Sequence, residues 1–147
     1  MKTKSKKPKV NILLLITGSI AAVRIPLLVS QLVKENFEIK CVISKNAEKL
    51  IQPLSLSILS RNSCILEEDQ WSHRQSSPLH INLCNWADIL IMAPLTATTL
   101  SKWVNGNADG LIPSILIASV KPIIVAPAMN TKMWLNSAVQ KNYEILE

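Results

Sequence analysis

Polar residues able to do chemistry follow several apolar runs of this sequence, each set beginning where a run ends. Gly18 and Ser19 follow the first run, residues 96–99 follow a later one, and Asn130 follows the last. We interpret these runs as buried parallel strands. Open α/β sheets bind ligands beyond the carboxyl ends of their strands, so we expect these sets to share one site.

Asn130 has two roles compatible with its position. The apolar run 123–126 ends at Pro127, which has no N–H to donate to a sheet ladder and therefore predicts the end of a strand. A helix is expected to begin at Asn130, where its side chain can cap free backbone N–H groups. A polar side chain just beyond a strand can also bind a ligand. Plain capping is the commoner role, and both stay open.

The turn at Gly18 is compatible with an anion site. A glycine beside a helix start lets backbone N–H groups approach an anion, and the helix dipole favours negative charge there. The turn lacks the GxxxxGK[ST] pattern of a P-loop, and Gly18 stands alone where a dinucleotide fingerprint needs three glycines. A phosphate site and a plain strand-to-helix turn fit equally well. Ser44, at the end of the second run, could add a hydroxyl.

His80 shortly precedes the run 89–93, whose end is rich in hydroxyl groups. A histidine in such a place is more often structural, but its position also allows a role as an acid–base group. His73 lies in the polar loop 62–78 beside Trp71 and has no evident partner. That loop is expected at the surface, where it could form an oligomer contact.

Composition and charge narrow the class of protein. A chain of 147 residues with 48% hydrophobic and 4% aromatic residues predicts one domain with an aliphatic core. Five lysines lie within residues 1–9, so the net charge of +6 comes mostly from this head. We predict a flexible basic tail over residues 1–8 and a domain over 9–147. A tail that contacts nucleic acid or an anionic surface is less favoured, because no basic stripe with aromatic residues follows it.

The sequence gives little support for a metal site, for disulfide bonds or for a membrane-spanning segment. The three cysteines form no CxxC pair, and the histidines show no ligand spacing with them, which favours reduced thiols in a cytoplasmic protein without a metal site. The apolar run 111–129 is interrupted by three prolines and a lysine, so it is a poor membrane span.

The runs alternate with helical patterns, which predicts a doubly wound α/β layer sandwich. The strands are expected at residues 10–16, 37–43, 89–93 and 123–126, with a short one near Cys64. The helices are expected at residues 20–34 with a kink or boundary at Pro26, 47–61 interrupted at Pro53, from about 100, 111–120, and from 130 to the end.

Four stretches taken together resemble one family. They are Gly18-Ser-Ile-Ala-Ala22, His80-Ile-x-Leu-x-x-Trp-Ala-Asp88, Ala93-Pro-Leu-Thr-Ala-Thr-Thr-Leu100 and Pro127-Ala-Met-Asn-Thr-Lys-Met-Trp134. Their order and spacing resemble the flavin-dependent cysteine decarboxylases, in particular the phosphopantothenoylcysteine decarboxylases. In bacteria such a domain is often the N-terminal half of a bifunctional coenzyme A biosynthesis flavoprotein. The resemblance runs from about residue 9 to the C-terminus. The last stretch is highly specific, whereas the single-glycine turn is not.

The resemblance implies a three-layer, Rossmann-like or flavodoxin-like fold that binds FMN and assembles into homotrimers or dodecamers. It implies decarboxylation of 4′-phosphopantothenoylcysteine to 4′-phosphopantetheine. His80 would be the base, and Asn130 would bind the substrate carboxylate beside Ala128 and Met129. The FMN phosphate and ribityl chain would be held by Gly18, Ser19, Ile20, Ala21 and Ser44, and the flavin edge would be contacted by Thr96, Ala97, Thr98 and Thr99.

Two features depart from the family pattern. Thr98 stands where the motif Pro-x-Ser-Ala-Asn-Thr has its asparagine, so this flavin contact loses an amide fork. The family continues into a flap with a cysteine proton donor, and no such segment precedes the end at Glu147, so we expect a truncated or split gene product. The alternatives are a peptidyl-cysteine decarboxylase, a prenylated-flavin synthase of the same fold, or a non-catalytic flavin-binding subunit.

Overall fold

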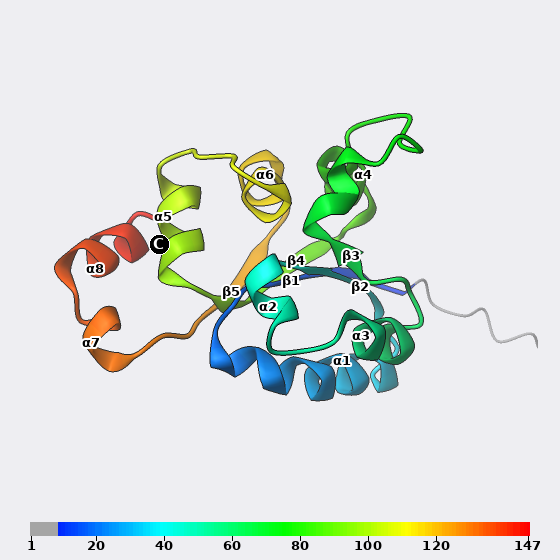
Figure 1. Cartoon of the computed structure of the whole chain (residues 1–147), viewed down its shortest axis with the longest axis horizontal. Coiled ribbons are helices and arrows are strands. Elements are labelled where there is room, and N and C mark those ends of the chain that lie inside the picture. Colours follow the sequence, from blue (N-terminus) through cyan, green and yellow to red (C-terminus); the bar gives the residue numbers. More distant parts are fainter. Residues whose placement is uncertain (1–8) are drawn as a thin grey trace, which may run out of the picture.

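The computed structural model describes residues 9–147, and the predicted basic tail at 1–8 lies outside the described residues. Five strands form one parallel sheet in the order β3-β2-β1-β4-β5 (Figure 1). The strands are β1 (Asn11–Ile16), β2 (Glu38–Ile43), β3 (Ile65–Leu66), β4 (Ile89–Leu95) and β5 (Ile123–Pro127). The predicted doubly wound parallel sheet is confirmed, including the short strand near Cys64.

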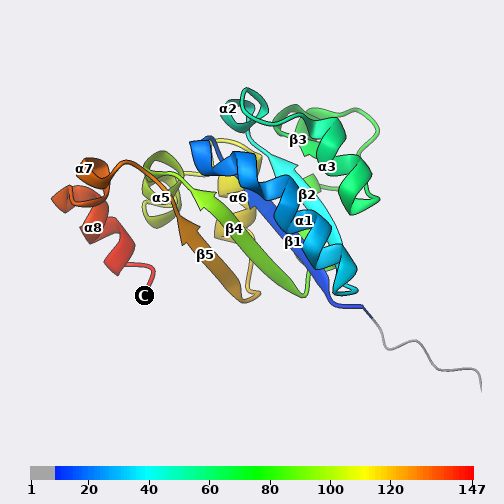
Figure 2. The ribbon, with the colours of Figure 1, turned by 90° about the horizontal axis from the view of Figure 1, so that it is seen from below.

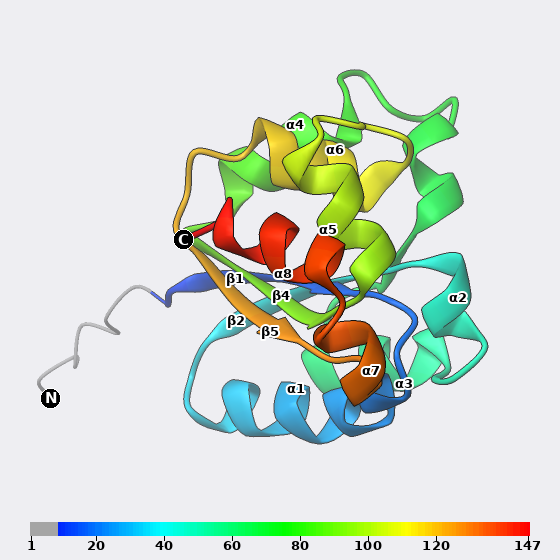
Figure 3. The same ribbon diagram turned by 90° about the vertical axis from the view of Figure 1, so that its left-hand side faces the viewer.

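Helices cover both faces of the sheet, which confirms the three layers (Figures 1 and 3). One face carries the 3-10 helix η1 (Ile20–Arg24), α1 (Ile25–Lys34) and α3 (Pro53–Ser60). The other carries α4 (Leu79–Trp86), α5 (Ala97–Val104), α6 (Leu111–Ala118) and α8 (Ser137–Glu144). Three short helices join these elements: α2 (Lys45–Glu48), η2 (Glu67–Trp71) and α7 (Thr131–Trp134).

The central strand β1 is buried on both faces, which explains its unbroken aliphatic run. Ile12, Leu14 and Ile16 pack into the core beneath α1 and α3, whereas Leu13 and Leu15 pack beneath α4 and α6. Successive side chains of a strand point to opposite faces, so a strand covered on both sides needs apolar residues at every position. β1 therefore divides the core into two clusters.

Of the two prolines at the strand ends, Pro127 ends its strand as expected, whereas Pro94 does not. β4 continues through Pro94 to Leu95, and β5 includes Pro127, which lies opposite Leu95 after a register shift. β5 is the edge strand, so the N–H that Pro127 lacks removes no bond from the middle of the sheet. Just after β5, Ala128 N still donates to Leu95 O of β4 at 3.1 Å.

Two helix boundaries in the structure differ from those predicted from the sequence. α5 begins at Ala97, three residues before the predicted start, because the Thr96 side chain caps it. The C-terminal helix is two helices, since Asn136 caps a new one at Ser137. Pro26 lies in the first turn of α1, where its missing N–H costs nothing, so the predicted boundary there is confirmed. Among residues 9–147, none of the helices has the length and apolar character needed to cross a bilayer.

Candidate functional site

The carboxyl ends of β1, β2, β4 and β5 open into one cavity of about 1490 Å³. Figure 2 shows these ends pointing to the side where α2, α5 and α7 lie. The cavity is larger than the roughly 300–1,000 Å³ typical of a site for one small molecule. Every residue named as a site candidate lines it: Gly18, Ser19, Ile20, Ala21, Ser44, His80, Thr96, Ala97, Thr98, Thr99, Ala128, Met129 and Asn130. The role of each remains a prediction.

Gly18 brings two helix starts together. A side-chain carbon added at Gly18 would lie 2.5 Å from the Cβ of Asn46 and 3.1 Å from its backbone carbonyl carbon. Only glycine therefore lets the turn after β1 lie against the start of α2. The Ser19 hydroxyl accepts from Ala21 N at 3.4 Å, and the Ser44 hydroxyl accepts from Ala47 N at 3.3 Å. Two hydroxyls and two sets of helix N–H groups meet here, which suits a phosphate.

Thr17 is a site residue that the sequence analysis missed. It is only 3% exposed, and its hydroxyl donates to Pro94 O at 2.5 Å while accepting from Thr96 N at 3.2 Å. This one side chain ties the turn after β1 to the turn after β4. A threonine directly before the Gly18 turn was the available signal, but its partners lie about eighty residues away.

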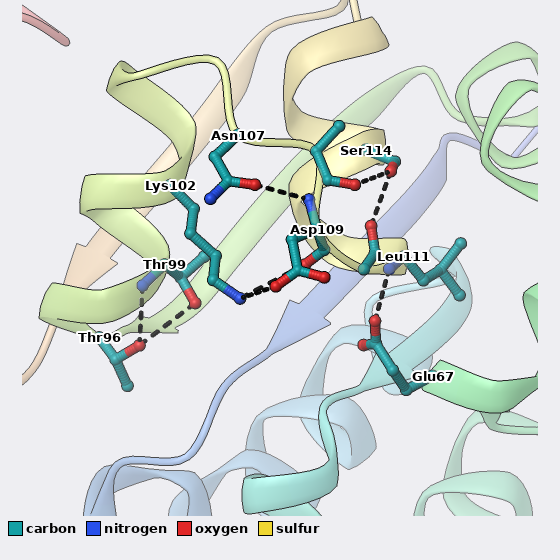
Figure 4. A network of polar contacts seen from close by, with 10 residues as sticks. Glu67, Thr96, Thr99, Lys102, Asn107, Asp109, Leu111 and Ser114 are labelled. Carbon is teal, nitrogen blue, oxygen red and sulfur yellow. Dashed lines mark hydrogen bonds and ion pairs between the residues drawn. The ribbon is translucent and has the colours of Figure 1, made fainter.

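Two hydroxyl groups at the start of α5 take part in hydrogen bonds within that turn. Thr96 Oγ1 accepts from Thr99 N at 3.4 Å and lies 3.2 Å from Thr99 Oγ1 (Figure 4). Thr99 is nearly buried, whereas Thr98 is exposed at the cavity and its hydroxyl makes no hydrogen bond to another described residue. Thr98 thus presents a hydroxyl at the cavity that is free of hydrogen bonds to the described residues.

Asn130 caps a helix, and its position also allows the second role left open by the sequence. Its Oδ1 accepts from Lys132 N at 2.9 Å, which caps α7. Its amide NH₂ makes no hydrogen bond to another described residue, and Asn130 is exposed at the cavity. The cap occupies one lone pair of the acceptor oxygen and leaves both N–H donors of the amide for a ligand. Asn130 is therefore suited to an acceptor such as a carboxylate.

His80 is the histidine of the cavity. It lies in the first turn of α4 and is half-buried, whereas His73 is exposed and does not line the cavity. An imidazole can accept or donate a proton near neutral pH. His80 is consequently the side chain in this cavity best suited to proton transfer.

The cysteines lie away from the site. Cys41, Cys64 and Cys84 are unpaired, and none lines the cavity. Burial raises the pKa of the Cys64 thiol to about 12 and also raises the pKa values of Cys41 and Cys84, so all three are poor thiolates. Within residues 9–147, no group of three acidic, histidine or cysteine side chains could hold a metal ion.

Comparison with known proteins identifies the family. The model of the family described as Flavoprotein matches residues 1–147. This chain belongs to the Flavoprotein family. It is 36% identical over 133 residues to phosphopantothenoylcysteine decarboxylase of Mus musculus, covering 88% of the chain and 65% of the relative. It is 34% identical over 137 residues to the coenzyme A biosynthesis bifunctional protein CoaBC of Bacillus subtilis, covering 92% of the chain and 33% of the relative.

A solved PPC decarboxylase structure has the same fold. A PPC decarboxylase mutant complexed with pantothenoylaminoethenethiol superposes with a TM-score of 0.83 at 36% identity, covering 95% of this chain and 78% of that one. The chain spans about a third of the Bacillus relative and about two thirds of the mouse relative. The family resemblance drawn from the four sequence stretches is thus confirmed.

Proposed function

We propose that this flavoprotein domain binds FMN and decarboxylates 4′-phosphopantothenoylcysteine, a step that yields 4′-phosphopantetheine for coenzyme A biosynthesis. The observation that carries the proposal is the meeting of the Gly18 turn, His80 and Asn130 in one cavity, within a chain of this family. The cavity is large enough for a cofactor and a substrate together.

The turns after β1, β2 and β4 would hold FMN. The close approach at Gly18 and the hydroxyls of Ser19 and Ser44 fit a phosphate, and no acidic side chain lies among residues 17–21 or 44–46 to repel it. Thr98 would reach the ribityl chain or the flavin edge from the start of α5. When bound, FMN supplies a two-electron oxidation of the cysteine moiety and returns those electrons after CO₂ has left.

Asn130 would bind the substrate carboxylate through its amide N–H groups while its oxygen caps α7. A neutral amide orients the carboxylate without the strong stabilisation that a buried guanidinium would give, and such stabilisation would oppose loss of CO₂. Met129 and Ala128 are its neighbours in the chain, line the same cavity and would pack beside the substrate there. His80 would take up the proton that the cysteine moiety releases.

We further propose that the domain assembles into homotrimers or larger multiples of them. In the described part of the chain, no helix covers β5 on the face that carries α1 (Figure 2). Ile124 of β5 is 54% exposed there, and Ile20, Val23 and Leu27 are also exposed by half or more. Apolar residues gathered on an open face are a common mark of a protein interface. A flap and a ligase domain belonging to the same protein, and a cytoplasmic location, remain predictions.

Replacing His80 with asparagine tests the proposed activity. We expect release of CO₂ from 4′-phosphopantothenoylcysteine to fall by about 10²- to 10⁴-fold, because the acid–base group is lost, while the protein still retains FMN. His73→Asn is the matched control, since His73 lies outside the cavity, and it should turn over like the unchanged protein.

Two results would reject this proposal. One is a His80→Asn protein as active as the His73→Asn control. The other is the absence of product from the unchanged, FMN-loaded protein even when the family's C-terminal flap is supplied, which would favour a non-catalytic flavin-binding subunit. Faster turnover of a peptide ending in cysteine would instead assign the peptidyl-cysteine reaction.

A further inference from the structure

Part of the cavity wall is built from two segments far apart in the sequence. Glu67, Gln70 and Trp71 of η2 form one segment, and the first turn of α6 forms the other. A single hydrogen bond joins them: Glu67 Oε1 accepts from Leu111 N at 2.5 Å across 44 residues (Figure 4). Neither residue of this bond belongs to the predicted FMN turns at Gly18, Ser44 and Thr96.

The bond replaces a missing helix cap. The residue before α6 is Gly110, which has no side chain to cap the helix. The carboxylate of Glu67 takes this place, and both its negative charge and its acceptor oxygen suit the exposed N–H groups of a helix start. A hydrogen bond to a carboxylate is stronger than one between neutral groups. Glu67 therefore joins η2 to the start of α6.

Gly110 is specialised for the same contact. Its φ of 112° is one that residues with side chains rarely adopt, and a Cβ added there would collide with Glu67 Oε1. The backbone at Gly110 thus leaves just the space that the carboxylate fills. Gly110 and Glu67 are far apart in the chain, and the conformation of one accommodates the side chain of the other. The contact is therefore a specific structural feature of the cavity wall.

The contact lies at the opposite end of η2 from Trp71. Glu67 is the first residue of η2 and Trp71 the last. Trp71 lines the cavity and yet is 79% exposed, so a broad apolar ring lies at its opening without a partner among the described residues. A rigid indole ring offers large apolar contact at a small cost in conformational entropy.

We propose that Glu67 is a positioning residue that holds Trp71 as the surface against which the pantothenoyl arm of the substrate packs. This inference rests on the proposed function, because it assumes that FMN and the reactive thiol end occupy the deeper part of the cavity. The arm carries two methyl groups on one carbon, a shape that an aromatic face can contact. Trp71 would then set the preference for substrates that carry this arm.

Two thiols that differ in this arm test the inference. Pantetheine and N-acetylcysteamine share the thiol end, and their Kd values would be measured by calorimetry on the FMN-loaded protein. We expect Trp71→Ala and Glu67→Ala each to weaken pantetheine binding by about tenfold and to leave N-acetylcysteamine binding unchanged. Because Glu67 acts through Trp71, the double variant should lose no more than Trp71→Ala alone.

The controls separate a positioning role from a general loss of structure. Glu68→Ala removes the same charge from the neighbouring exposed residue, which does not line the cavity, and should bind pantetheine normally. Glu67→Gln keeps an acceptor oxygen and should restore most of the affinity. Trp71→Ala changes an exposed side chain and still tests the wall if Glu67→Ala does not fold.

Several outcomes would overturn the inference. Unchanged pantetheine affinity in Trp71→Ala, an equal loss for both thiols, or a changed oligomeric mass by light scattering would each do so, the last because Trp71 would then be a subunit contact. Failure of the unchanged protein to retain FMN would instead reject the proposed function. Retained FMN without pantetheine binding would reject the assigned substrate and the inference with it.

Discussion

Gly18→Ala is expected to weaken FMN binding by about a hundredfold. The added methyl group would lie 2.5 Å from the Cβ of Asn46, far inside normal contact, so the start of α2 must move away from the turn after β1. The hydroxyls of Ser19 and Ser44 would then no longer face one phosphate. Titration of the purified protein with FMN, followed by quenching of flavin fluorescence, measures the loss.

A second glycine and a compensating change provide the controls. Gly106→Ala places a side chain at a φ of 66° where no atom lies within 4 Å, so it costs some stability but should leave FMN affinity intact. Asn46→Gly removes the atom with which the new methyl group collides, so it should recover part of the affinity lost in Gly18→Ala. Equal FMN affinity in Gly18→Ala and Gly106→Ala would show that the close approach does not form the cofactor site.

Asn130→Asp is expected to abolish binding of the carboxylate substrate without disturbing the fold. Aspartate caps a helix as well as asparagine does, so its oxygen can still accept from Lys132 N. The amide donors, however, are replaced by a second negative oxygen that repels the substrate carboxylate. We expect the substrate Kd to rise by about a hundredfold or more, while the melting temperature and FMN affinity change little.

Asn136→Asp is the matched control for this change. Asn136 caps α8 in the same way, accepting from Ala138 N at 3.0 Å, but it does not line the large cavity. It should therefore have no effect on substrate binding, which calorimetry with 4′-phosphopantothenoylcysteine would measure. Equal substrate affinity in the two aspartate variants would remove Asn130 from the proposed carboxylate site.

The sequence predicts the strands well where burial alone determines them. β1 is covered on both faces and therefore has aliphatic residues at every core position, a pattern that the sequence shows directly. Pro127 ends β5 as its position predicts, whereas β4 runs past Pro94 to Leu95 because the pairing with β5 shifts register between Met92 and Leu95. Local sequence does not contain that information.

The residues of the candidate site also differ in whether local sequence could indicate them. Ser19, Ser44, Thr96 and Asn130 each bond within a few residues of themselves, so helix-start patterns could indicate them. Thr17 and the Glu67–Gly110 contact could not be found this way, because their partners come from distant segments that meet only once the sheet has formed. Contacts between segments that are distant in the sequence form part of this cavity, and only the folded structure reveals them.

The visible absorption spectrum of the purified protein, before and after addition of FMN and gel filtration, tests the central claim most directly. Three turns at one edge of the sheet are expected to retain about one flavin per chain, with absorption bands shifted from those of free FMN by the less polar surroundings. A colourless protein that elutes apart from the added FMN, under conditions in which it is folded, would contradict the account.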